Sequence, residues 1–315
     1  MNEREGKAAI RILGAVARAD KKIDEREKAA LKQALIDFQS TLPDGTTIES
    51  LLSENIDLDA QLAVVKTPVA RRAVFEAAVA MSIVDGTASA EENEVIARIR
   101  SAFSMDTTES VLQKTFWKAF PGAPEPVLDA EVRQRRVDAL RATRATWAAI
   151  FGAIPFPFVG QVGVLMMFDS VTRDIAALWG HNLTRKERIA RFGALVSFAI
   201  AQGALQELLK LVPGWGTAAG SISGGVIAFT ATWALARAVN HHFEQEGKTT
   251  TEELKAAFAA AKDEGKKAFE DKKDDIERGK QQHGPQLAEL SKKLEAGEIT
   301  PDEFDQRISD IASQP

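Results

Sequence analysis

The chain has 315 residues, of which 45% are hydrophobic and 27% are charged, so it can build two folded domains and a tail. The net charge of −5 argues against a general nucleic-acid binder, because such domains are usually strongly basic. The absence of cysteine excludes disulfides, thiolate chemistry and zinc–cysteine sites, and is compatible with a reducing compartment. Arg11 and Arg18 interrupt the apolar part of the N-terminus, which predicts an amphipathic helix rather than a signal peptide. We therefore expect a cytoplasmic protein.

Residues 1–120 carry apolar side chains at helical spacing and show no convincing strand alternation. The apolar side of the first helix consists of Ala9, Ile12, Leu13, Val16 and Ala17. A second helix is expected from about Asp24, and further helices are expected over 48–65, 68–84, 90–103 and 107–119. We therefore predict an all-α fold that begins with a helical bundle over residues 1–120.

Two segments of this region resemble each other, and each predicts a helix, a short acidic loop and a second helix. They are AVARADKKIDEREKAAL at 15–31 and VAMSIVDGTASAEENEVI at 79–96. Asp24 and Glu27 in the first copy, like Ser89 and Glu92 in the second, have the spacing of a helix N-cap and its third helical residue. Capping therefore accounts for these four residues without a ligand.

Asp20 and Asp85 occupy equivalent places in the two copies, near the C-terminus of a helix. The helix dipole disfavours a carboxylate there by a few tenths to about 1 kcal/mol. A hard cation such as calcium or magnesium, bound by both loops, would offset that cost. The alternative is that both residues only shape exposed loops, since the full EF-hand pattern is missing.

The motifs ARADKKIDEREKAAL and SIVDGTASAEENEVI resemble the TerB-like family of all-helical domains linked to tellurite resistance and stress. The resemblance covers roughly residues 5–105. It implies that the family's acidic cluster, thought to bind metal, maps onto Asp20, Asp24, Asp85, Glu91 and Glu92. The expected cofactor is accordingly a divalent cation, calcium or magnesium, and no other cofactor is expected.

Residues 121–126, PGAPEP, are expected to form a stiff proline-rich linker between domains. Beyond it, Pro155 and Pro157 separate two predicted helices, 127–154 and 157–179. Proline disfavours helical geometry in the residue before it, and it suits the first position of a helix. The two helices should form a hairpin whose apolar tip contains Phe151, Ile154, Phe156 and Phe158.

A second hairpin is expected to complete the central region, which we assign to residues 127–245. Thr184 and Glu187 have the spacing of a capping box at its start, and a second helix is expected over 215–243. Small residues recur there at every fourth position, as in a glycine zipper: Gly216, Gly220, Gly224, Ala228, Thr232 and Ala236. Glycine costs about 1 kcal/mol relative to alanine in a helix, so this pattern predicts close packing against another helix, in protein or in lipid.

A cluster of arginines precedes the first uncharged stretch: Arg133, Arg135, Arg136, Arg141 and Arg144. These residues could bind anionic lipid head groups at about 1 kcal/mol each, although a solvated helix face explains them equally well. The last helix exceeds the roughly 20 residues needed to span a bilayer, but each uncharged arm of the first hairpin has only about ten. We therefore expect a shallow or re-entrant hairpin, in a cytoplasmic protein that is peripheral to or partly inserted in the inner membrane.

Two segments of the central region resemble the YcjF-like helical domain, a domain of unknown function often found beside GTPase domains or in inner-membrane proteins. They are AAIFGAIPFPFVGQVGVLMMFDSVTRDIAALWG at 148–180 and LLKLVPGWGTAAGSISGGVIAFTATWALARAVNHHFEQ at 208–245. The resemblance covers about residues 140–246. It implies a membrane-linked role and a GTPase partner, and it implies no known catalysis.

The remaining chain is expected to be a tail in two parts. Residues 246–283 form a charged helical linker with a thin apolar stripe: Leu254, Phe258, Ala261, Ala268, Phe269 and Ile276. Residues 284–315 form a short helical hairpin in which Thr300, Pro301 and Glu303 start the last helix. This segment resembles a short C-terminal oligomerisation domain of two small helices, which implies a homo-oligomer.

No catalytic constellation can be assembled from the sequence. Gly247-Lys248-Thr249 is similar to the end of a phosphate loop, but His242 stands where that loop requires glycine. We therefore predict a non-enzymatic, membrane-associated stress-response or scaffold protein with membrane lipids and a GTPase or other protein as partners, and no nucleic acid. The alternative is a soluble helical interaction module that oligomerises or binds a GTPase, and a metal-dependent hydrolase using the acidic loops is a third, poorly supported class.

Overall fold

The computed structural model describes residues 1–19, 54–82, 89–105, 123–153, 157–184, 186–193, 195–196, 224–295 and 298–312. Regular structure in these ranges is entirely helical, so the predicted all-α fold is confirmed. The chain divides into a first unit, Met1–Glu109 with Ser197–Ile222, and a second unit, Ser110–Val196 with Ser223–Pro315. The helices expected near Asp24 and over 107–119 lie outside the described residues, as does the 121–122 part of the linker.

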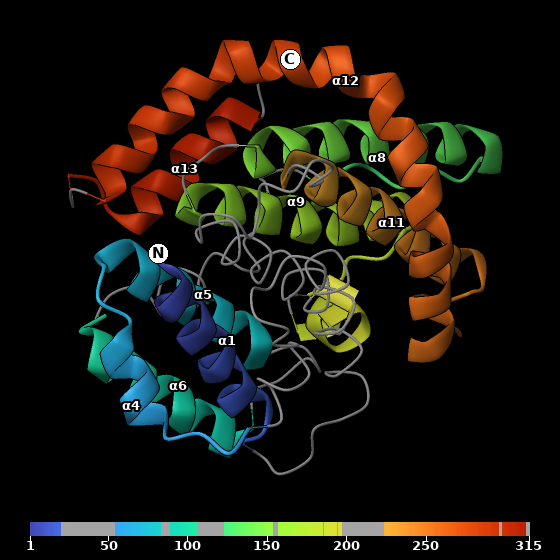
Figure 1. Cartoon of the computed structure of the whole chain (residues 1–315). Helices are drawn as coiled ribbons and strands as arrows, with labels where there is room; N and C mark the ends of the chain where they lie inside the picture. The colour runs from blue at the N-terminus through green and yellow to red at the C-terminus, as the bar shows by residue number, and fades with distance from the viewer. Residues whose placement is uncertain are drawn as a thin grey trace. The chain divides into compact units, whose positions relative to one another are not determined.

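The first unit contains α1 (Glu3–Ala17), α4 (Leu58–Val64), α5 (Pro68–Ser82) and α6 (Ala90–Phe103), and α1 contacts each of the other three (Figure 1). The apolar stripe predicted for the first helix is buried in this core. The fully buried side chains around it include Ile12, Leu13, Val16, Val74, Phe75 and Ile99. The helix predicted over 90–103 is confirmed at both ends by α6.

A buried carboxylate ties the start of α1 to the segment between α4 and α5. Asn2 and Glu5 form a capping box, in which Glu5 N donates to Asn2 Oδ1 (2.8 Å) and Asn2 N donates to Glu5 Oε2 (2.9 Å). The other oxygen, Glu5 Oε1, accepts from Lys66 N (2.9 Å) and Thr67 N (3.4 Å). Burial alone would raise the pKa of Glu5, but these hydrogen bonds outweigh it and lower that pKa below its ordinary value.

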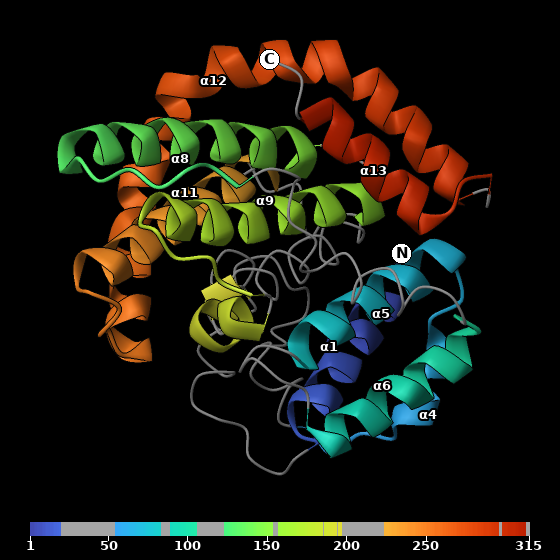
Figure 2. The same ribbon diagram turned by 180° about the vertical axis from the view of Figure 1, so that it is seen from behind.

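The second unit contains α8 (Ala130–Gly152), α9 (Pro157–Leu178), α11 (Gly224–Glu244), α12 (Thr251–Glu295) and α13 (Pro301–Ala312). In this unit α11 packs against α8, α9 and α12, and α12 also contacts α8 and α13. Figure 2 shows α12 as a long curved helix beside α8 and α11, with α13 folded back along its final part. The helix predicted from Pro157 begins at that residue as α9.

Local capping signals in this unit are confirmed by the hydrogen bonds. Thr184 N donates to Glu187 Oε2 (2.8 Å), and Glu187 N donates to Thr184 Oγ1 (3.4 Å). The same reciprocal pair joins Thr300 and Glu303, with distances of 2.8 and 3.2 Å. Helix α13 accordingly starts at Pro301. Proline suits this first position, because the backbone N–H that it lacks would have no partner within the helix there.

Helix α12 differs from the expected solvated linker. It runs without interruption to Glu295 and passes through the boundary that we placed between residues 283 and 284. Its apolar stripe is buried, including Leu254, Phe258, Phe269 and Ile276. Two glycines allow this approach, because a Cβ atom at Gly265 would lie 3.3 Å from Thr230 Cα of α11, and one at Gly279 would lie 2.4 Å from Ile150 Cδ1 of α8.

Candidate functional site

The predicted cation site falls mostly outside the described residues, which exclude Asp20, Asp24 and Asp85. Glu91 is exposed in the first turn of α6. Glu92 is buried, and its carboxylate accepts from Ser89 N (2.7 Å) while Glu92 N donates to Ser89 Oγ (3.1 Å), so the predicted capping role of this pair is confirmed. Within the described ranges, no group of three histidine or acidic side chains is arranged to hold a metal ion.

Four of the five clustered arginines on α8 engage groups of the second unit, and three of them, Arg133, Arg141 and Arg144, reach groups outside α8. Arg133 lies over the Trp179 ring at 3.8 Å and donates to the carbonyl oxygens of Val127 (2.8 Å) and Leu128 (3.2 Å). Arg135 is exposed and pairs with Glu131, one turn earlier on the same helix (3.0 Å). Arg136 is also exposed.

Arg141 is buried between α8, α11 and α12. Its guanidinium group lies over the Trp233 ring at 4.1 Å and pairs with Asp138 (2.9 Å) and Glu264 (3.4 Å). Burial lowers the pKa of Arg141, and the two carboxylates oppose that change. Because an arginine remains charged in proteins, this side chain joins three helices as a buried cation.

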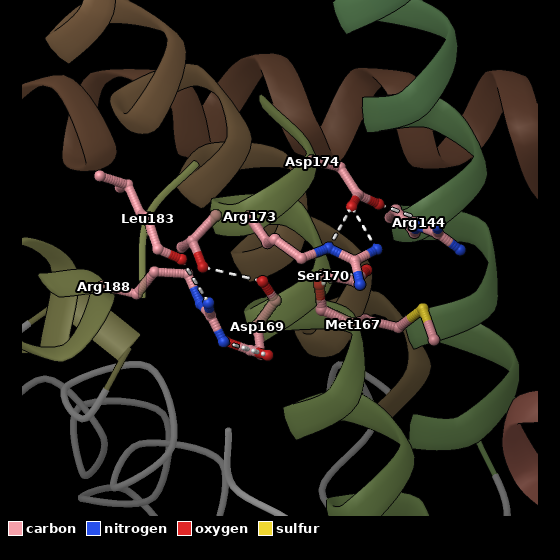
Figure 3. Close-up of polar contacts among 9 residues, drawn as sticks. Arg144, Met167, Asp169, Ser170, Arg173, Asp174, Leu183 and Arg188 are labelled. Carbon is pink, nitrogen blue, oxygen red and sulfur yellow. Dashed lines mark hydrogen bonds and ion pairs between the residues drawn. The ribbon is translucent and has the colours of Figure 1, made fainter. Parts of the chain in front are cut away.

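Two carboxylates of α9, Asp169 and Asp174, are the most buried charged groups among the described residues, and Asp169 meets Arg188 (Figure 3). Arg188 Nε and Nη2 donate to the two carboxylate oxygens of Asp169, at 2.8 and 3.1 Å. Arg188 Nη1 also donates to the Leu183 carbonyl oxygen (2.9 Å). The side chains are 0% exposed for Asp169 and 7% exposed for Arg188, so the pair is a two-pronged ion pair away from water.

A second buried carboxylate, that of Asp174, lies five residues further along α9. Asp174 Oδ2 accepts from Arg144 Nη2 of α8 (3.0 Å), and Asp174 Oδ1 accepts from Arg173 Nε (2.6 Å). Figure 3 shows both arginines converging on this carboxylate from different helices. The pair that includes Arg144 therefore fixes α8 against α9, while the pair of Asp169 fixes the residues after Leu183 against α9.

This cluster of Asp169, Asp174, Arg144, Arg173 and Arg188 is named here the α9 ion cluster. Each carboxylate is held by guanidinium groups, so the arrangement favours a fixed helix register over proton transfer or nucleophilic attack. Its two aspartates were not among the residues predicted from the sequence to form a site. The available signal was that Asp169 and Asp174 are the first two acidic residues of a helix that carries no charge from Pro157 to Phe168.

Small residues bring α8 and α11 into contact close to their backbones. A Cβ atom at Gly152 of α8 would lie 2.7 Å from Gly224 O and 2.8 Å from Ala228 Cβ. A Cβ atom at Gly225 would lie 2.9 Å from Ala149 O. The described part of the small-residue stripe thus packs within protein, whereas Gly216 and Gly220 lie outside the described residues.

The tip predicted for the first hairpin is described only in part. Phe151 is fully buried, and its ring occupies the space where Gly163 of α9 would carry a Cβ atom (2.3 Å). Ile154 and Phe156 lie outside the described residues, and the side chain of Phe158 does as well. Among the described helices, none has the combined length and apolar character required to cross a membrane.

A family model matches the N-terminal part of the chain. No curated protein and no solved structure matches the chain. The matched region contains all four helices described in the first unit and ends before the residues that carry the YcjF-like and C-terminal resemblances. Residues 6–114 match the family model described as tellurite resistance protein TerB, and the described part of this region is helical.

Proposed function

We propose that this chain is a non-enzymatic helical scaffold of a stress response related to tellurite resistance, which acts by binding other proteins. The TerB match supports the stress-related part of the proposal for residues 6–114. The helical body of the second unit supplies the scaffold. A protein partner, such as a GTPase, or a second copy of the chain would be the binding partner.

The close packing of α11 on α8 is the observation that favours a protein-interaction module rather than a hairpin inserted in a membrane. Small-residue faces in membrane proteins serve to pair helices within lipid. Here Gly225 of α11 lies against Ala149 of α8, and Gly265 of α12 lies against Thr230 of α11. These contacts occupy α11 within the protein, as expected for a helix that is apolar on all sides and buried in a protein core.

Flotation with vesicles tests the proposal against the membrane-associated alternative. Purified protein without detergent should remain in the aqueous fraction when mixed with vesicles rich in phosphatidylglycerol, and its mass by light scattering should give its self-association directly. Flotation of the wild type, lost in an Arg135→Glu/Arg136→Glu variant, would overturn the scaffold proposal and favour lipid binding by the exposed arginines of α8. Glu131→Gln, which changes a charge on the same exposed surface, is the control.

A divalent cation at the acidic loops of the region that matches TerB remains part of this proposal. The family match over residues 6–114 includes Asp20 and Asp85, and oxygen ligands suit calcium and magnesium. An ion whose free concentration is 100 times its dissociation constant adds about 2.7 kcal/mol to the free energy of unfolding when it binds only the folded protein. The melting temperature should therefore rise with calcium, magnesium or manganese and fall again with chelator. An unchanged melting temperature with all three ions would remove the cation.

The Asp20→Asn/Asp85→Asn variant should lose any rise caused by the ion. Glu91→Gln distinguishes the exposed member of the predicted cluster, because Glu91 carries no capping role. Glu92→Gln is less informative, since it also disturbs the capping box with Ser89.

A further inference from the structure

Two buried histidines hold helix α12, one at its start and one near its C-terminal part. His242 of α11 is 4% exposed, and His283 of α12 is 7% exposed. Each contacts groups of another element in the second unit, and neither has a carboxylate partner among the described residues. A buried imidazole without a carboxylate is stable when neutral and unfavourable when protonated.

His242 fixes the turn that leads into α12. Its Nδ1 atom lies 2.5 Å from Thr249 Oγ1, directly before the capping residue Thr250. Its Nε2 atom is buried beside the turn, 3.6 Å from a Cβ built at Gly247, and no described group bonds to it. The Phe192 ring lies edge-on to the imidazole, with 5.3 Å between the ring centroids.

The groups around His242 disfavour a positive charge on its imidazole ring. Burial is the largest cause that lowers its pKa, and Arg191, His181 and His241 lower it further. The other charged groups on the surrounding elements are engaged with partners: Arg188 with Asp169, Glu244 with Asn240, Lys248 with Glu246, and Glu253 with Thr250.

His283 packs against Trp147 of α8, with the ring centroids 5.0 Å apart. Burial is the only cause that lowers the pKa of His283 among the described residues. The neighbouring charges are paired, Lys280 with Glu277 on α12 and Arg144 with Asp174 between α8 and α9. A proton on His283 would therefore be added to a largely apolar contact between α12 and α8.

We propose that His242 and His283 form an acid-sensitive latch, in which protonation of both imidazoles releases α12 from α8 and α11. Histidines that are buried when neutral keep the helix in place above pH 6.5, the ordinary histidine pKa. Because the pKa of each is lowered in the folded protein, this stabilisation is lost as the pH falls below 6.5 toward the folded value. Each histidine can change the ratio of packed to released α12 by up to about tenfold per pH unit.

Hydrogen exchange of the full chain tests the latch at pH 7.5 and pH 5.5, after correction for the intrinsic pH dependence of exchange. Exchange should rise at pH 5.5 in residues 251–290, with a much smaller rise in α9. The His242→Gln/His283→Gln variant should lose this local rise. The matched His181→Gln/His241→Gln variant, which changes the exposed and partly exposed histidines, should keep it. An equal acid response in both variants, or a uniform rise over the second unit, would overturn the proposal.

Nuclear magnetic resonance titration of the wild-type histidine ring protons gives a second measurement that does not depend on the variants folding. His242 and His283 should titrate below pH 6.5, the ordinary histidine pKa, and Trp147 fluorescence should fall as the adjacent His283 becomes charged. Ordinary titration of His242 and His283 near pH 6.5 or above would refute the latch.

Discussion

Replacing Asp169 with asparagine should lower the free energy of unfolding of the second unit by about 3–5 kcal/mol. The carboxylate of Asp169 is fully buried and accepts two hydrogen bonds from Arg188, at 2.8 and 3.1 Å. The amide would remove the negative charge of Asp169 from the buried guanidinium group of Arg188, and breaking a buried pair in this way is costly. Since small domains have about 5–15 kcal/mol of stability in total, the loss should be easy to measure.

Urea unfolding of the full chain, followed by circular dichroism and tryptophan fluorescence, measures this loss. Glu131→Gln is a suitable control, because Glu131 and Arg135 form an exposed pair that should contribute less than about 1 kcal/mol. The paired replacement Asp169→Leu/Arg188→Met removes both charges and should recover much of the stability lost by Asp169→Asn.

The reasoning would be refuted if Asp169→Asn destabilised the protein no more than Glu131→Gln. A double replacement that is as unstable as Asp169→Asn would show that packing around the pair, rather than the unpaired charge, causes the loss.

Two further substitutions, each with a control, test the second and the first unit separately. Gly152→Val should destabilise the second unit by at least about 1–3 kcal/mol in calorimetry, because its Cβ atom would lie 2.7 Å from Gly224 O of α11. The control Gly284→Ala should be neutral or stabilising, because no atom lies within 4 Å of the added Cβ atom. Glu5→Gln should weaken the first unit, and its effect should shrink in acid. The pKa of Glu5 is lowered from 4.5, so its contribution is present above pH 4.5 and is lost as pH falls through the folded pKa. Glu3→Gln, which removes a half-exposed carboxylate paired with Lys7 one turn along α1, is the control and should cost less stability than Glu5→Gln in urea unfolding.

The sequence predicted features that depend on neighbours within one or two turns. Ser89 and Glu92 started α6 as expected, and Pro157 and Pro301 marked the first residues of α9 and α13. Residue type at each of these positions limits the local backbone directly. Such signals need no knowledge of the partner helix, which explains why they were recovered.

The partners of charged side chains were not predictable in the same way. Arg141 belonged to an arginine cluster in the sequence, but its environment is set by Trp233 and Glu264, which are distant along the chain. The α12 stripe was narrow enough to suggest a solvated helix, and only the glycines at 265 and 279 indicate that backbones can approach there. Asp169 could have been noticed as a charge in an apolar helix, although its partner Arg188 could not.

The two glycines of α12 also determine which changes in the gene this helix can tolerate. Gly265 and Gly279 are about four helical turns apart, so they meet α11 and α8 from nearly the same side of the helix. Substitution of solvent-facing residues in the segment between Gly265 and Gly279 leaves that alignment intact. Insertion or deletion of a single residue would rotate one glycine away by about 100°, and would present a larger side chain to Thr230 or Ile150. Over this segment, evolutionary drift should therefore alter the exposed residues freely, while it conserves the length and the buried Phe269 and Ile276.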